Sequence, residues 1–354
     1  MLSKENFTTE HINQLRTKNC NDAGLIERTV FAFGLLEALV ETGLQFIFKG
    51  GSSLLLLLPV PLRLSTDIDI VVPPGTQIEE YIEKARAFFP FIKAEEATRK
   101  AKGGINKRHF KFYYNSRVAE DEPMFILLDV LYEENFYQKT VEREIKNSLL
   151  ITEGDNLSVT IPSVDCILGD KLTAFAPLTT GIEFGDKNME IMKQFFDINS
   201  LIDEFSDFEC LRNSYFTVSE TEIGYRRKED RKTDLTPEKA LLDTLSSAIC
   251  IASRGKYRHD HFEDFLDGTR KVTNHIFSSD FNMEIASRYA PRIIYLASCL
   301  LTNTPFSKVD DPAELLQNTI SQEELSLIKG FKKLDPMAYG YLVKADRLLA
   351  GYHI

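Results

Sequence analysis

The sequence predicts an N-terminal domain of the α/β or α+β class followed by an all-helical C-terminal domain. Short apolar runs typical of strands occur with helical patterns up to about residue 205, and helical patterns dominate beyond it. The chain has 354 residues, 43% of them hydrophobic, which is enough for two domains with sizeable cores. We therefore expect one domain over residues 1–205 and a helical domain over residues 206–354.

The N-terminal domain begins with a helix over about residues 22–42, where apolar side chains recur at helical spacing and Gly43 is a stop signal. Four strands follow, and a helix near residues 78–89 separates the second from the third. The expected strands are Gln45–Lys49, Asp67–Val72, Phe110–Tyr114 and Met124–Tyr132.

The C-terminal domain shows one remaining strand signal, near Tyr215–Val218, and a polar stretch over Glu220–Thr236 that we expect to be a loop or hinge. The rest of this domain has helical periodicity. The expected helices are Pro237–Arg254, His261–Ile276, Met283–Leu301, Ser321–Lys332 and Pro336–Leu349.

Composition excludes several classes of protein. The longest apolar run, Leu54–Leu62, contains two prolines and is far shorter than the roughly 20 residues of a membrane-spanning helix. The polar N-terminus lacks the features of a signal peptide. The five cysteines form no C-x-x-C pair, which favours free thiols in a reducing compartment. We therefore expect a cytoplasmic protein that does not enter a membrane.

The net charge of −11 disfavours binding of nucleic acid unless a local basic patch contacts the phosphates. One candidate patch surrounds two glycines near residue 103, and a second, at residues 226–232, also contains acidic residues and reads as a solvated loop. The first patch consists of Arg99, Lys100, Lys102, Lys107, Arg108 and Lys111.

Two aspartates, Asp67 and Asp69, stand two positions apart in an apolar strand. Strand periodicity puts both carboxylates on one face, about 7 Å apart, and Ile68 and Ile70 on the other. Such a pair can hold a divalent cation, because Mg²⁺ at phosphates is bound through one or two carboxylates. The alternative is an ordinary solvent-facing strand.

A third aspartate, Asp129, lies within the run Met124–Tyr132, which reads as a strand buried on both faces. A carboxylate there needs a cation or a hydrogen-bonding partner. Asp129 is thus either a third metal ligand or a strand-end residue paired with an arginine or a backbone amide. The histidines, His109 among them, offer no base with an identifiable partner, so Ser-His-Asp or Cys-His hydrolysis has no support.

A glycine-serine turn, Gly50-Gly51-Ser52-Ser53, joins a strand to the apolar helix Leu54–Leu58. Its glycines let backbone N–H groups approach a phosphate, and its serines can cap the helix and donate to phosphate oxygens. No G-K-[ST] follows, so the turn is not a P-loop. The alternative is a plain strand-to-helix turn.

These motifs together resemble the AbiEii/AbiGii toxin family of nucleotidyltransferases. Lys49-Gly50-Gly51-Ser52-Ser53-Leu54, then Arg63-x-Ser65-x-Asp67-x-Asp69, is similar to the family's first signature, KGGT-x-L followed by R-x-S-x-D-I-D. Ser52 replaces the usual threonine and keeps its hydroxyl.

The family's second signature, KL-x-A followed by D-L-x-x-L, is matched by Lys171–Ala174 and Asp197–Leu201. An arginine usual after KL-x-A is missing, and Lys193 partly replaces it. If Asp165–Phe175 forms a helix, Lys171 lies within it, and its charge suits a pyrophosphate leaving group. Asp197, in an apolar setting, needs a partner, and Lys171 is the obvious one.

The resemblance implies a polymerase-beta-like core, a small mixed sheet flanked by helices, in the toxin of a bacterial toxin-antitoxin or abortive-infection system. It implies Mg²⁺, or Mn²⁺ in its place, NTP as substrate, an antitoxin encoded nearby, and RNA, preferably the tRNA 3′ end, as acceptor, met by the basic patch over residues 99–111. The implied catalytic residues are Asp67, Asp69, Lys171 and Asp197. The expected metal ligands are Asp67, Asp69 and Asp129. The expected phosphate-binding residues are Lys49, Gly50, Gly51, Ser52, Ser53, Arg63 and Ser65.

Two alternatives remain open at this point. One is a small-molecule nucleotidyltransferase of the antibiotic-modifying kind, whose activity would lack the steep salt dependence of RNA binding. The other is a nucleotide-binding interaction module without catalysis, which would bind NTP without turnover.

Overall fold

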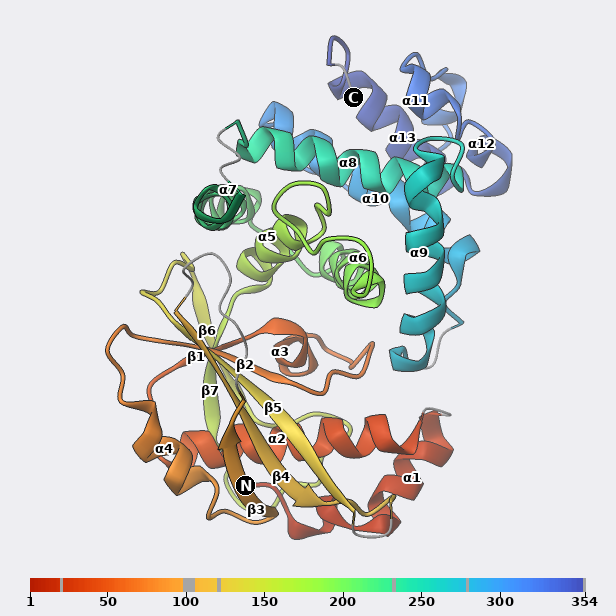
Figure 1. The fold of residues 1–354 in the computed structure, drawn as a ribbon. Coiled ribbons are helices and arrows are strands. Elements are labelled where there is room, and N and C mark those ends of the chain that lie inside the picture. Colours follow the sequence, from red (N-terminus) through yellow and green to blue (C-terminus); the bar gives the residue numbers. More distant parts are fainter. Residues whose placement is uncertain (20–21, 98–105, 120–121, 231–233, 278–279, 353–354) are drawn as a thin grey trace. The chain divides into compact units, whose positions relative to one another are not determined.

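The chain forms two compact units in the computed structural model, which describes residues 1–19, 22–97, 106–119, 122–230, 234–277 and 280–352 (Figure 1). Unit 1 comprises Met1–Ser163 and Asn274–Ser279, and unit 2 comprises Val164–Thr273 and Asp280–Ile354. The expected boundary at residues 205/206 falls inside unit 2, because helix α7 (Phe208–Asp230) packs against α5 (Val164–Ala174), which lies on the other side of that boundary. The α+β class with a helical C-terminal part is confirmed.

A mixed five-stranded sheet is the centre of unit 1, with the strand order β1-β2-β5-β4-β3. Strands β2 and β5 are parallel and the other neighbours are antiparallel. A separate antiparallel pair, β6-β7, packs beside β1. The strands are β1 (Ile47–Lys49), β2 (Ile68–Val72), β3 (Phe91–Glu96), β4 (Lys107–Asn115), β5 (Pro123–Tyr132), β6 (Thr140–Glu144) and β7 (Ser158–Pro162).

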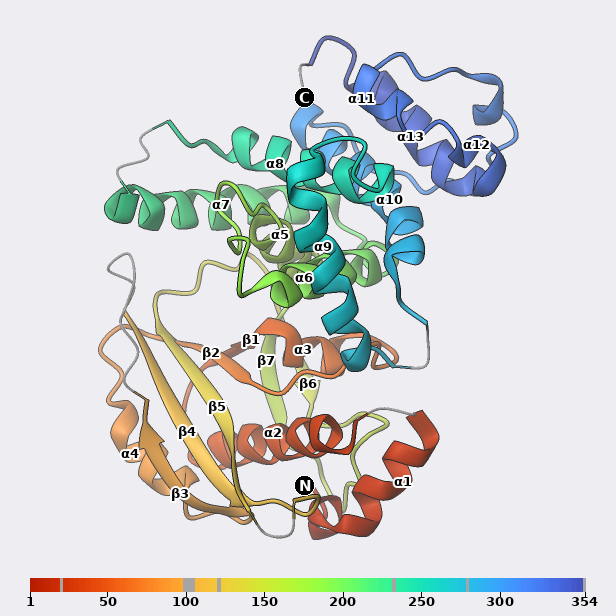
Figure 2. The same cartoon turned by 45° about the vertical axis from the view of Figure 1, so that its right-hand side comes forward.

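Helix α2 covers the apolar face of this sheet, crossing the strands in both views (Figures 1 and 2). The ring of Phe31 on α2 lies 4.0 Å from that of Tyr114 on β4, centroid to centroid. The buried Glu27 accepts a hydrogen bond of 2.8 Å from the Ser116 hydroxyl, which satisfies its charge within the core. The helices of unit 1 are η1 (Lys4–Phe7), α1 (Thr9–Asn19), α2 (Ala23–Glu41), α3 (Gly50–Leu57) and α4 (Ile78–Ala85).

The regular elements described in unit 2 are all helices, with α5 packed between α6 and α7 and with α10 against α8 and α13. The short 3-10 helix η2 crosses its junction with unit 1. The helices are α5 (Val164–Ala174), α6 (Asn188–Ile202), α7 (Phe208–Asp230), α8 (Pro237–Ser253), α9 (His259–Val272), η2 (Thr273–His275), α10 (Met283–Thr302), η3 (Leu315–Gln317), α11 (Glu323–Ser326), α12 (Phe331–Leu334) and α13 (Pro336–Leu348).

Two predictions for unit 2 are wrong at α7. The strand expected at Tyr215–Val218 is helical, and the loop expected from Glu220 is a continuation of the same helix to Asp230. Leu211, Tyr215 and Val218 are all buried, so this face has the spacing of a helix that packs on α5. An aromatic and β-branched run suggested a strand, but tertiary packing decided the outcome.

The single helix expected at Ser321–Lys332 is instead two short ones, α11 and α12, separated by a turn that ends at Gly330. Four cysteines, at positions 166, 210, 250 and 299, are buried thiols outside any disulfide, as the absence of a disulfide frame predicts, whereas Cys20 lies outside the described residues. None of the helices in the described ranges combines the length and the apolar character that crossing a membrane requires.

Candidate active site

Four polar side chains form one row across the sheet of unit 1. Lys49 on β1 pairs in register with Asp69 on β2, Asp69 with Asp129 on β5, and Asp129 with His109 on β4. Register partners project to the same face of a sheet, so the four side chains are neighbours. The adjacent row, which includes Ile68, is apolar and faces the core. The predicted alternation of carboxylates and apolar residues is therefore present in β2.

Asp69 is half-buried in this row. Burial raises the pKa of Asp69 to about 6, the carboxylates of Asp129 and Asp67 act in the same direction, and Lys107 and Lys49 oppose them. Loss of hydration and like-charged neighbours both disfavour the ionised form. A cation placed at this carboxylate would offset both effects.

Asp67 immediately precedes β2 and stands two positions before Asp69 in the sequence. Its carboxylate Oδ1 is 3.9 Å from the Arg28 guanidinium on α2, and the Thr66 hydroxyl donates to the same oxygen at 3.5 Å. About half of the Asp67 side chain is exposed, so its carboxylate can bind a cation that comes from solvent.

Asp129 is held on both of its carboxylate oxygens. The ammonium of Lys107 lies 2.8 Å from Oδ2, and Nδ1 of His109 lies 2.6 Å from Oδ1. Burial opposes ionisation of Asp129, but these two partners outweigh it and keep its pKa below the usual value. Asp129 thus has local partners, but they are a lysine and a histidine and not the arginine or backbone amide of the alternative. The view that His109 has no identifiable partner was wrong.

The glycine-serine turn brings the start of α3 against the carboxylate of Asp69. Gly50 has φ +79°, a left-handed conformation that favours glycine, and a Cβ atom there would collide with the Asp69 carboxylate. A Cβ at Gly51 would collide with the guanidinium of Arg63 and lie 2.9 Å from the Ser65 hydroxyl. Gly50 is therefore favoured both by its φ and by the close approach of Asp69, whereas a side chain at Gly51 would have to displace Arg63.

The two serines of the turn use their hydroxyls on the backbone. Ser52 donates to the carbonyl of Asp67 at 2.5 Å, and Ser53 donates to the carbonyl of Gly50 at 2.8 Å. Both serines are buried. The Ser52 hydroxyl therefore ties the turn to the segment that leads into β2, and the Ser53 hydroxyl closes the turn on itself.

The donor set fits a hard divalent cation at two carboxylates. Asp67 and Asp69 offer carboxylate oxygens, and Mg²⁺ at a phosphate substrate needs one or two of these. Asp129, in contrast, already binds two cationic or ring donors. Over the residues that the structure describes, no group of three or more His, Cys, Asp or Glu side chains is arranged to hold a metal ion. A ligand role for Asp129 stays a prediction.

The basic patch is described only in part, since Arg99, Lys100 and Lys102 lie outside the described residues. Arg108 faces away from the row, where it pairs with Glu96 and Glu79. Lys107, His109 and Lys111 alternate along β4 and share the face of Asp129. The Lys111 ammonium lies 4.4 Å above the ring of Phe125 on β5. This face of β4 is thus basic and aromatic beside the carboxylates.

Unit 2 contains the second predicted group of residues. The ammonium of Lys171 on α5 lies 2.9 Å from Oδ2 of Asp197 on α6, and the two side chains are only 9% and 2% exposed. The predicted pairing is confirmed, as is the helix around Lys171.

Sequence reasoning missed the partners of Asp129. Lys107 and His109 stand two positions apart at the start of β4, which was expected to begin only at Phe110. The alternation Lys107, His109, Lys111 against Phe110, Phe112, Tyr114 is the signal that could have shown both the longer strand and its polar face.

A small mixed sheet with a glycine turn and aspartates on neighbouring strands is the arrangement of a nucleotidyltransferase. The chain belongs to the family of the nucleotidyl transferase AbiEii toxin of type IV toxin–antitoxin systems, whose profile matches residues 34–271, more than half of the chain. Membership implies transferase activity and an antitoxin partner. No curated protein sequence matches the chain significantly.

Proposed function

We propose that this protein transfers nucleotides from an NTP to an RNA acceptor, with the tRNA 3′ end as the preferred acceptor and Mg²⁺, or Mn²⁺, as the cofactor. The observation that carries the proposal is the register of the sheet, which puts Asp69 beside Asp129 and the Gly50 turn against Asp69. A phosphate-binding turn in contact with a carboxylate is what an NTP with its cation requires.

Each group of residues has a proposed role in this reaction. Asp67 and Asp69 would hold the cation, which when bound neutralises the triphosphate and lowers the pKa of the attacking hydroxyl. The N–H groups at the start of α3 orient the phosphates, supported by the packing of Arg63 on Gly51. The acceptor oxygen forms a bond to the α-phosphorus as the bond to pyrophosphate breaks, and the hydroxyl proton leaves to solvent.

Asp129 has a proposed supporting role beside these ligands. Its two partners, Lys107 and His109, keep it ionised next to Asp69, so it adds negative charge where the cation is expected. In unit 2, Lys171 is proposed to offset charge on the leaving pyrophosphate, and Asp197 to hold the Lys171 ammonium in place.

The face of β4 supports RNA as the acceptor class. Lys107 and Lys111 provide positive charge, and Tyr113 and Phe125 provide rings on which bases can stack. Because the chain is acidic overall, binding of a polyanion such as RNA requires a local basic and aromatic surface of this kind. A role as a cytoplasmic toxin that an antitoxin counteracts is proposed from the family.

The test is a transfer assay that compares acceptor classes. Purified protein with Mg²⁺ and each NTP labelled at its α-phosphate is given total RNA or, separately, a panel of aminoglycosides. The proposal expects label on RNA, with a rate that falls steeply with salt. Label on the aminoglycosides alone, or NTP binding without any transfer, would refute it. Lys111→Gln should weaken the RNA reaction, whereas Lys84→Gln, on α4, should not.

A further inference from the structure

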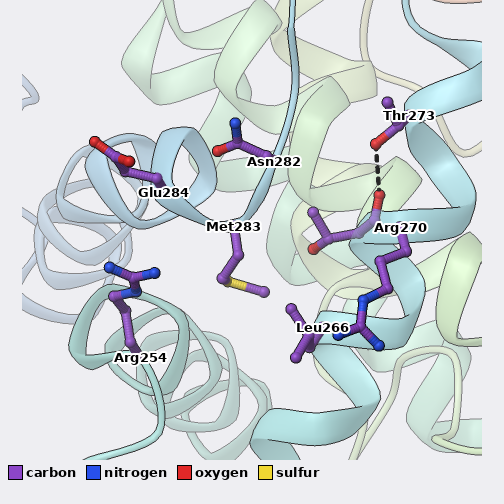
Figure 3. Close-up of a pocket in the computed structure, with 8 residues that line it drawn as sticks. Arg254, Leu266, Arg270, Thr273, Asn282, Met283 and Glu284 are labelled. Atoms are coloured by element: carbon purple, nitrogen blue, oxygen red, sulfur yellow. Dashed lines mark hydrogen bonds between the residues drawn. The ribbon is translucent and has the colours of Figure 1, made fainter.

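Unit 2 contains a pocket of about 380 Å³ whose lining includes none of the residues assigned to the transfer reaction (Figure 3). Its wall is built from the end of α8, the last turns of α9 and the start of α10. This volume lies within the range of small-ligand sites, about 300–1,000 Å³. The lining residues are Arg254, Leu266, Thr269, Arg270, Thr273, Asn282, Met283 and Glu284.

Two arginines from different helices give the pocket its charge. Figure 3 shows Arg254 and Arg270 on opposite sides, with Met283 and Leu266 between them. Both arginines are exposed, and within the described part of the chain neither guanidinium has a hydrogen bond or an ion pair. The one lining carboxylate, Glu284, is engaged at 2.7 Å by Arg288 on the next turn of α10. The pocket is therefore net positive in an acidic chain.

The other polar groups of the pocket add few free donors. The Thr273 hydroxyl donates to backbone carbonyls, at 2.9 Å for Thr269, as drawn in Figure 3. The Thr269 hydroxyl donates to the carbonyl of Phe265 at 2.7 Å. Asn282 uses its amide oxygen to cap α10 at 3.0 Å from the Ile285 amide, which leaves its NH₂ group as a donor. The donors that a ligand can meet are thus two guanidiniums and one amide.

Arg254 is held in a conformation that few arginines adopt. It caps the C-terminus of α8 with φ 54° and ψ 47°, and Gly255 after it is also left-handed at φ +79°. A left-handed residue that is not glycine costs roughly 1–2 kcal/mol. An arginine in this strained conformation, and without a protein partner in the described residues, suits a ligand-binding role.

We propose that this pocket binds a nucleoside phosphate, with a phosphate at the guanidinium of Arg254 or of Arg270 and the base or ribose on Leu266 and Met283, which lie between them (Figure 3). A planar guanidinium can donate two parallel hydrogen bonds to the oxygens of one phosphate. The apolar side chains of Leu266 and Met283 offer a surface on which a base or a ribose can pack. The nucleotide can be free in solution or part of an RNA strand. Nucleotide binding in unit 2 does not depend on the transfer reaction proposed above.

The experiment measures equilibrium binding of two probes to the full chain without divalent cations. One probe is AMP, and the other is a single-stranded oligoribonucleotide of mixed sequence. The variants are Arg254→Gln and Arg270→Gln. The matched control is Lys271→Gln, which removes one charge from α9 at a residue that is paired with Asp267 at 2.7 Å outside the pocket.

Each arginine variant is expected to weaken binding of at least one probe about tenfold or more, the effect of losing a charged hydrogen bond to phosphate, and Lys271→Gln is not. For RNA, the slope of log K against log salt concentration should also become shallower by about 0.7 for each charge removed. Loss for AMP alone identifies a free nucleotide, and loss for RNA identifies a strand. Equal behaviour of the arginine variants and the control for both probes overturns the proposal. The same comparison in an Asp69→Asn background separates this result from any failure of the transfer chemistry.

Discussion

Breaking the buried ion pair of unit 2 should cost far more stability than breaking a surface pair of the same length. Lys171→Met leaves the carboxylate of Asp197, which is 2% exposed, without the ammonium 2.9 Å away. Removing one partner of a buried ion pair costs about 3–5 kcal/mol, whereas an exposed pair four residues apart on a helix contributes about 0.3–0.5 kcal/mol. Burial, not distance, sets the difference.

Lys271→Met is the matched control, because Lys271 lies 2.7 Å from Asp267 with 52% and 40% of the side chains exposed. The chain has no tryptophan, so urea unfolding is followed by circular dichroism, and hydrogen exchange of α5 and α6 assigns the loss to unit 2. The double variant Lys171→Met/Asp197→Leu should recover most of the loss, since it leaves no unpaired charge. Equal costs for Lys171→Met and Lys271→Met would refute the reasoning.

Three further predictions concern unit 1. Asp69→Asn should stabilise the protein by about 1–3 kcal/mol at pH 7. Because the pKa of Asp69 is raised, its carboxyl binds a proton more tightly in the folded than in the unfolded chain, so the stability of the wild type falls as pH rises from about 4 to about 6. Urea unfolding should therefore show a gain for Asp69→Asn at pH 7 and none at pH 4, and a loss at pH 7 would contradict this prediction. Gly50→Ala should abolish nucleotide transfer, because its Cβ would collide with the Asp69 carboxylate. The control Gly75→Ala, at φ +84° with open space around it, should cost only conformational strain and keep transfer activity. Equal transfer rates for the two variants would contradict this prediction. Lys107→Met should raise the pKa of Asp69 and of Asp129 and move the acid limb of the pH–rate profile upward, and an unmoved limb would count against the assigned charges.

Much of the active-site strand was predictable because it depends on local pattern. The alternation of Asp67 and Asp69 with Ile68 and Ile70 predicts the two faces of β2 directly. The double glycine predicts a close approach, and the structure shows that Asp69 is what approaches Gly50. Pattern identified the residues, but the pairing of distant strands was needed to show which of them meet.

The partners of Asp129 were not predictable from its own strand. The parallel register of β2 with β5, and the antiparallel register of β5 with β4, fix Asp129 between Asp69 and His109. Neither register follows from the periodicity of a single segment. In unit 2, by contrast, the buried Asp197 required a cation, and Lys171 supplied it, because an unpaired carboxylate in an apolar helix face is too costly to leave.

The most direct test of the central claim is transfer to RNA by the wild type and by Asp69→Asn under identical conditions. The wild type, with Mg²⁺ and NTPs labelled at the α-phosphate, should label a discrete RNA species from a total RNA pool, and Asp69→Asn should label none while remaining folded. Equal labelling by the two proteins, or no labelling by the wild type with any of the NTPs, would contradict the account.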